Sequence, residues 1–233
     1  MRKLLLVFLL LTGYISRPQA EKDDKVYFSE ALAMHLPKYE KEARNAYRVN
    51  DYERGSALFD SLVKNSLRNS YIDNFRFYNL RKKPVQLYEF KKPVYLITYS
   101  SWCVQGKGEI PAINKLANKY KDQIDFVVLF WDKFSTVKDI AKKFNKYIKV
   151  VYVDERKNSD PFIIKNLKHS LGLPNYFLIS GDKRIEDIRR SVFLPYNASE
   201  EKSYELNYEL IEEGISNHLI THVHKEDIAD ISQ

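Results

Sequence analysis

Residues 94–103 read Val-Tyr-Leu-Ile-Thr-Tyr-Ser-Ser-Trp-Cys and end on the one cysteine of the 233-residue chain, Cys103. Residues 94–99 are apolar and rich in β-branched and aromatic side chains, a composition typical of a buried strand. Residues 103–121 carry apolar side chains at helical spacing, which predicts a helix directly after the strand. The pattern therefore predicts a thiol at the carboxyl edge of a sheet, where open α/β sheets bind their ligands.

A cysteine in the first turn of a helix has a favourable environment for its thiolate. The unpaired N–H groups and the positive end of the helix dipole both stabilise the negative charge. We therefore expect a lowered pKa at Cys103 if the protein performs thiol chemistry. Trp102 is expected to flank the sulfur and to exclude some water from it.

The rest of this region alternates between strands and helices. A short hairpin over residues 75–90 comes first. Further strands are predicted at residues 125–131, 149–153, 174–179 and 185–188, and further helices at 136–147 and 161–170. Strands that alternate with helices pair in parallel through right-handed crossovers, whereas the late hairpin adds an antiparallel edge. The predicted fold class is α/β, with a mixed central sheet and helices on both faces.

Three short motifs resemble those of one family. They are Tyr99-Ser100-Ser101-Trp102-Cys103, Glu109-Ile110-Pro111, and Gly172-Leu173-Pro174 before residues 175–179. Their order and spacing resemble the thioredoxin superfamily, and within it the exported TlpA/ResA-type thiol–disulfide oxidoreductases, which are related to the AhpC/TSA redoxins. The resemblance implies a thioredoxin fold over residues 73–191. It also implies a cis Leu173–Pro174 bond beside the reactive sulfur.

The chain departs from that family at its active-site motif. The second cysteine of Trp-Cys-x-x-Cys is replaced by Gly106, so no disulfide can form within one chain. The resemblance then implies Cys103 as the nucleophile, with Trp102, Gln105, Gly106, Leu173 and Pro174 lining its site. We expect monothiol chemistry that depends on a partner, with no cofactor and no metal. The alternative is a non-catalytic thioredoxin-fold protein that serves for binding or as a scaffold.

Other chemistries fit the residues less well. Peroxiredoxins place Pro and Thr seven and three residues before the nucleophile, where this chain has Leu96 and Ser100. His218, His222 and His224 lack the acidic or cysteine ligands of a known metal motif. Glu109 is expected to pair with a nearby lysine, and His169 is expected at the surface.

The two flanks of the domain predict export and two helical additions. Residues 1–20 have a basic start and an apolar run, which predicts a signal peptide, and residues 21–72 read as a helical accessory region. Residues 192–233 predict a C-terminal helix and a tail.

Without residues 1–20, which hold three basic and no acidic residues, the net charge falls from +7 to +4. This balance does not indicate nucleic-acid binding. No stable membrane span is expected after removal of the signal. The expected partners are thiol- or disulfide-bearing envelope proteins or small thiols, in the periplasm or cell envelope if the source is bacterial.

Overall fold

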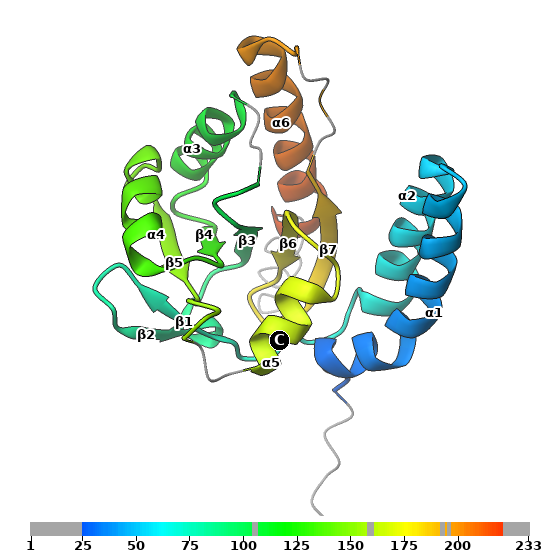
Figure 1. Cartoon of the computed structure of the whole chain (residues 1–233). Helices are drawn as coiled ribbons and strands as arrows, with labels where there is room; N and C mark the ends of the chain where they lie inside the picture. The colour runs from blue at the N-terminus through cyan, green and yellow to red at the C-terminus, as the bar shows by residue number, and fades with distance from the viewer. Residues whose placement is uncertain (1–24, 104–106, 158–160, 192–193, 195–196, 221–233) are drawn as a thin grey trace, which may run out of the picture.

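A computed structural model gives the fold and describes residues 25–103, 107–157, 161–191, 194 and 197–220. Seven strands form one sheet in the order β2-β1-β5-β4-β3-β6-β7. Helices lie on both sides of this sheet (Figure 1). The strands are β1 (Arg76–Asn79), β2 (Pro84–Gln86), β3 (Val94–Tyr99), β4 (Asp125–Phe130), β5 (Ile148–Tyr152), β6 (Asn175–Ile179) and β7 (Ile185–Arg190).

The sheet is mixed, as the alternation of elements predicts. β3 pairs in parallel with β4, and β4 pairs in parallel with β5. β6 pairs antiparallel with β3, and β7 pairs antiparallel with β6. The hairpin of β1 and β2 joins the other end of the sheet through antiparallel pairing of β1 with β5. The hairpin expected over residues 75–90 is therefore part of the central sheet.

Two apolar layers cover the sheet. All six residues of β3 are buried, because a strand in the middle of a doubly covered sheet has no solvated face. Tyr95, Ile97 and Tyr99 face one layer, and Val94 and Leu96 face the other. The first layer contains α3 (Glu109–Lys119), α4 (Phe134–Ile140) and α6 (Glu200–Ile215), and the second contains α1 (Phe28–Arg48), α2 (Tyr52–Leu62) and α5 (Pro161–Ile163).

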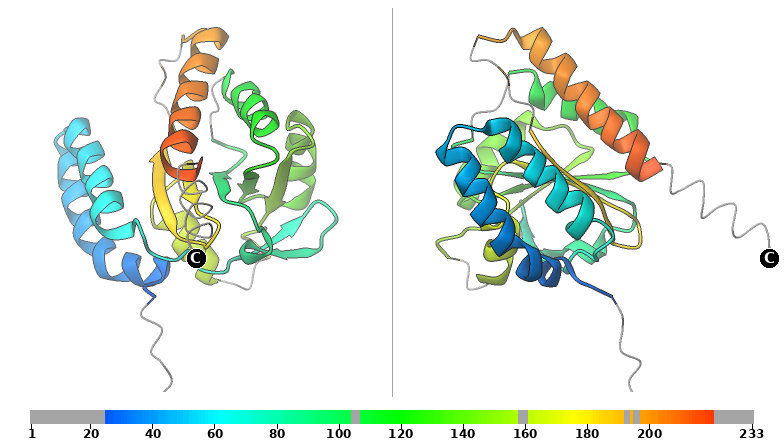
Figure 2. Two further views of the ribbon diagram at one scale, coloured as in Figure 1. Left: turned by 180° about the vertical axis from the view of Figure 1, so that it is seen from behind. Right: turned by 90° about the vertical axis from the view of Figure 1, so that its right-hand side faces the viewer.

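The helical additions at both ends of the chain pack onto this core. Phe28 and Leu32 of α1 are buried in the second layer, and Ile211 and Ile215 of α6 are buried in the first. Figure 2 shows the α1–α2 hairpin along the β7 edge of the sheet and α6 next to α3. Short helical segments complete the fold: η1 (Val63–Leu67), η2 (Leu87–Glu89), η3 (Ala141–Lys143), η4 (Ile164–His169) and η5 (Ser216–Ile220).

The predicted fold class is confirmed, including the helices at both ends of the chain. Some boundaries are wrong, because the helix expected from Cys103 begins at Glu109 and the helix expected to reach residue 147 ends at Ile140, followed by η3 up to Lys143. The predicted signal peptide, residues 1–20, lies outside the described part of the chain. Within the described part, no helix combines the length and the apolar composition needed to cross a bilayer.

Candidate functional site

The thiol of Cys103 lies in a turn that follows β3. The backbone N–H of Cys103 donates a hydrogen bond of 2.9 Å to the carbonyl oxygen of Ser100, the first residue after the strand. The Cys103 side chain is half-buried and packs against the apolar layer that contains α3 and α6. Trp102, by contrast, is 70% exposed. The strand therefore fixes the place of the thiol, while the preceding indole projects into solvent.

A carboxylate from the neighbouring strand holds this turn. Asp132, two residues after the end of β4, accepts hydrogen bonds from the backbone N–H of Ser101 at 2.7 Å and from its hydroxyl at 2.5 Å. The parallel pairing of β3 with β4 brings the two strand ends together, since Tyr99 lies opposite Phe130. Asp132 is not among the residues that the sequence predicts for this site. An acidic residue just after a parallel neighbour of β3 was the signal that could have identified it.

The helix that was expected to begin at Cys103 begins six residues later. Lys107 and Gly108 form a turn, and α3 begins at Glu109 with Gly108 as its N-terminal cap. Glycines at positions 106 and 108 disfavour helix in this stretch, because glycine loses the most backbone freedom there. Cys103 thus lies outside the first turn of α3, and the predicted stabilisation of its thiolate by that turn is wrong.

Gly108 also marks a close approach between two helices. A Cβ atom at this position would lie 2.2 Å from the backbone nitrogen of Tyr204 and 2.5 Å from the carbonyl oxygen of Glu200, both in α6. The backbone N–H of Gly108 donates a hydrogen bond of 3.2 Å to the Ser203 hydroxyl. The start of α3, which follows the Cys103 turn, is therefore fixed by a helix from the end of the chain.

The electrostatic surroundings of Cys103 favour the neutral thiol. Burial raises the pKa of the Cys103 thiol above its ordinary value, and the carboxylates of Asp132 and Glu109 raise it further. A hydrogen bond between the Cys103 sulfur and the Ser100 backbone and the positive charge of Lys168 lower this pKa, but they do not offset the other causes. The lowered pKa that was expected if the protein performs thiol chemistry is therefore not found, mainly because the sulfur is partly buried.

The cis peptide bond predicted between Leu173 and Pro174 is present. It directly precedes β6, whose first residue, Asn175, pairs with Thr98 of β3. The antiparallel register thus places Pro174 beside the end of β3, at the edge of the sheet where the Cys103 turn begins. Central parallel strands, an antiparallel partner for β3 and a cis proline at this edge identify the architecture.

The chain has a thioredoxin-like fold. Solved structures with a similar fold include the thioredoxin domain of a thiol-disulfide oxidoreductase from Bacteroides vulgatus, at 18% identity and a TM-score of 0.48, over 63% of this chain and 96% of that one. Another is a thiol:disulfide interchange protein from a Bacteroides species, at 17% identity and a TM-score of 0.46, over 62% of this chain and 90% of that one. No protein-family description matches the chain, and no curated protein matches it.

The end of β3 also contributes to a buried polar cluster. Glu109, which is 4% exposed, accepts hydrogen bonds from the hydroxyl of Tyr99 and, at 2.6 Å, from the hydroxyl of Tyr176. Burial, together with the Glu109 charge, raises the pKa of both tyrosines. The sequence-based prediction that Glu109 pairs with a lysine is wrong. The donors are tyrosines on β3 and β6, which sequence spacing alone did not bring to Glu109.

The remaining candidate residues divide between the described and undescribed parts of the chain. Gln105 and Gly106, like His222 and His224, lie outside the described residues. His169 is exposed, as expected, and its Nε2 lies 3.3 Å from a Glu155 carboxylate oxygen. The described residues contain no group of three or more His, Cys, Asp or Glu side chains that could hold a metal ion.

Proposed function

We propose that the protein is a partner-dependent thiol–disulfide exchange protein that acts through the single thiol of Cys103. The observation that carries this proposal is the position of Cys103 at the carboxyl end of β3, at the same sheet edge as cis Pro174. The sulfur is half-buried, so it is not enclosed in the core. The lining residues predicted from the sequence, Trp102, Gln105, Gly106, Leu173 and Pro174, are part of this proposal.

The reaction requires two external reactants, because the sequence contains no second cysteine. The Cys103 thiolate attacks one sulfur of a partner disulfide, forms a mixed disulfide and releases the other partner sulfur as a thiolate. A second thiol then attacks the partner's sulfur in the mixed disulfide, forms a new disulfide with it and releases Cys103. The net result is exchange of one disulfide for another, with the Cys103 thiol regenerated.

The environment of Cys103 favours a persistent mixed disulfide over rapid turnover. A raised pKa leaves little thiolate at neutral pH, which slows the attack by Cys103. It also makes Cys103 a poor leaving group, which slows its release by an incoming thiol. The mixed disulfide carries no charge on its sulfurs, so neither burial nor the nearby carboxylates oppose it. We therefore propose slow exchange with a long-lived covalent intermediate.

The raised pKa of Cys103 supports a second candidate, a thioredoxin-fold binding protein without thiol chemistry. The carboxylates of Asp132 and Glu109 both oppose ionisation of Cys103. In this case Cys103 is a semi-buried structural residue, and the site edge with exposed Trp102 binds a partner without a covalent step. For either function we propose an exported protein whose partners are envelope proteins, with small thiols as additional reactants of the first candidate.

Reaction with glutathione disulfide distinguishes the two candidates. The purified chain is incubated with glutathione disulfide between pH 6 and 10, and the adduct at Cys103 is followed by intact mass. Exchange predicts a native-state adduct that forms more slowly than in urea, persists after removal of free glutathione disulfide, and is released by added dithiothreitol. The pH profile should inflect above the pKa of about 8.5 that an ordinary thiol has.

Cys103→Ser is the control that assigns the adduct, since it removes the only thiol of the chain. A native protein that forms no adduct at any pH, while the unfolded protein does, overturns the exchange function and supports the binding protein. An adduct that forms faster in the native state than in urea contradicts the slow mechanism instead.

A further inference from the structure

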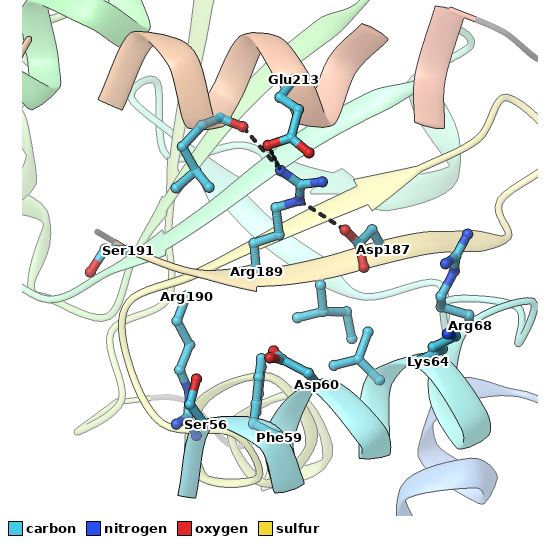
Figure 3. A pocket seen from close by; sticks show the side chains of 13 residues that line it. Ser56, Phe59, Asp60, Lys64, Arg68, Asp187, Arg189, Arg190, Ser191 and Glu213 are labelled. Atoms are coloured by element: carbon cyan, nitrogen blue, oxygen red, sulfur yellow. Dashed lines mark hydrogen bonds and ion pairs between the residues drawn. The ribbon is translucent and has the colours of Figure 1, made fainter. Parts of the chain in front are cut away.

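A groove lies along the β7 edge of the sheet, two strands away from β3, which leads to Cys103. It has a volume of about 600 Å³ and is bounded by β7, α2 with η1, and α6. Figure 3 shows β7 as its floor, with α6 on one side and α2 on the other. This volume lies within the range of about 300–1,000 Å³ that is usual for ligand sites.

The floor of the groove is an edge strand that, beyond its first residue, pairs on one side only within the described part of the chain. β7 is the last strand of the sheet and pairs with β6. Within the described part of the chain, no backbone hydrogen bond joins residues 187–190 to anything outside the sheet. An edge of this kind presents unpaired N–H and C=O groups, which are a template for another extended segment.

The chain already uses the beginning of this edge in the same way. The N–H of Asn69 donates to the carbonyl of Ile185 at 2.8 Å, and the N–H of Ile185 donates to the carbonyl of Ser70 at 2.9 Å. Tyr71 and Arg184 then form an antiparallel bridge. The segment 69–71 therefore pairs with Ile185, the first residue of β7, as a short added strand, and residues 187–190 beyond it line the groove.

The acidic groups on the α6 side of the groove are paired within the protein. Arg189 forms ion pairs with Asp187 at 2.8 Å and with Glu213 at 3.4 Å, and it also donates to the carbonyl of Leu210 at 3.2 Å. Figure 3 shows these contacts on the α6 side of β7. These charges hold one another, and one guanidinium against two carboxylates leaves this wall with a net charge of −1.

The opposite wall has an excess of positive charge. Arg190 donates to the Tyr39 hydroxyl at 2.9 Å and lies 4.0 Å from the centre of the Phe59 ring, so it is already engaged. Lys64 and Arg68 also line the groove, and neither forms an ion pair with a described residue. Asp60 is the one acidic side chain on this wall. Two available cations against one carboxylate favour an acidic ligand.

We propose that this groove binds an extended acidic peptide segment of another protein, which adds as a strand to residues 187–190 of β7. Backbone hydrogen bonds to the strand edge supply affinity that is independent of sequence, as in other cases of β-strand addition. Lys64 and Arg68 supply the preference for acidic side chains. The inference does not depend on the thiol chemistry proposed for Cys103.

A synthetic peptide tests this proposal. The probe is a fluorescent nine-residue peptide in which Glu alternates with Thr or Val, and binding is measured by anisotropy. The expected result is saturable binding that weakens at least tenfold in the double variant Lys64→Glu with Arg68→Glu. Lys115→Glu with Lys138→Glu is the matched control, because it reverses two exposed lysines on α3 and α4 and should leave binding unchanged.

N-methylation of single peptide bonds tests the geometry of binding. An added strand predicts loss of affinity at alternate positions of the probe, since only every second N–H faces the protein. Cys103→Ser should bind the probe as well as the unaltered chain does, which separates this site from the exchange site. Circular dichroism of each variant confirms that it remains folded.

Three outcomes would overturn the proposal. One is absence of binding at millimolar probe, and another is equal binding of a probe with Lys in place of Glu. The third is a concentration-dependent dimer of the chain that the Lys64→Glu, Arg68→Glu variant abolishes, because a second copy would then be the occupant.

Discussion

The carboxylate of Asp132 accepts two hydrogen bonds from Ser101, one from its backbone N–H at 2.7 Å and one from its hydroxyl at 2.5 Å. Ser101 lies two residues before Cys103, so one side chain both holds the turn and places a negative charge near the sulfur. The first role stabilises the turn. The second role opposes ionisation of the thiol.

Replacement of Asp132 by Asn should therefore make Cys103 more reactive. The amide keeps an acceptor for Ser101 but removes the negative charge, so the pKa of the thiol should fall and its thiolate fraction at pH 7.5 should rise. We expect a several-fold faster reaction with iodoacetamide, measured as a pH–rate profile. Asp139→Asn removes an exposed carboxylate of α4 and is the matched control. An unchanged profile in Asp132→Asn would show that its charge does not act on Cys103.

The two serines before Trp102 should respond in opposite ways to replacement by Ala. Ser101→Ala removes a hydrogen bond to Asp132 and should destabilise the fold by about 1 kcal/mol. Ser100 is 1% exposed, and its hydroxyl has no hydrogen-bond partner among the described residues. Ser100→Ala should therefore be neutral or slightly stabilising. Urea unfolding of the pair measures both effects, and a larger loss in Ser100→Ala would contradict this account.

Replacement of the buried Glu109 should destabilise the fold. Glu109→Leu leaves the hydroxyls of Tyr99 and Tyr176 buried without their acceptor, which should cost about 2–4 kcal/mol of unfolding free energy. Glu109→Gln keeps an acceptor and should cost about 1 kcal/mol. The test is whether Glu109→Leu has a lower free energy of unfolding in urea than Glu109→Gln. Equal stability of the Leu and Gln variants would mean that the two hydroxyls find other partners.

His218 should make the fold less stable in mild acid. Burial lowers the pKa of His218 below its ordinary value, although Asp187, 3.4 Å away, partly opposes this effect. The unfolded chain therefore binds a proton more readily than the folded chain does. Stability contributed by neutral His218 is complete above about pH 6.5 and is lost as the pH falls through the folded-state value.

Unfolding in urea at pH 7.5 and pH 5.5 measures this loss, and His218→Gln should reduce it. The acidic groups with lowered pKa, Asp139, Glu155 and Asp182, titrate below this window. His35→Gln, which alters an exposed histidine on α1, should leave the loss unchanged. If His218→Gln and the unaltered chain lose equal unfolding free energy between pH 7.5 and pH 5.5, a group other than His218 causes the loss.

The sequence predicts local structure better than it predicts the chemistry of the thiol. The apolar run at residues 94–99 was sufficient to predict β3, and the cis bond was implied by the resemblance of the Gly172-Leu173-Pro174 motif to the thioredoxin superfamily. The pKa of Cys103 depends instead on burial and, to a lesser extent, on Asp132, which is 29 residues away in the chain and reaches the turn through the pairing of β3 with β4. A local reading of the strand, cysteine and helix could not include that charge.

The contact at Gly108 sets a limit on how the protein can be divided. A methyl group there would meet the main chain of α6, which cannot move aside by a change of rotamer as a side chain can. Removal of α6 would also uncover the apolar layer that Ile211 and Ile215 complete. A recombinant fragment trimmed to residues 73–191 would thus lose the element that fixes where α3 begins. The smallest unit suitable for studying the thiol should extend to residue 220.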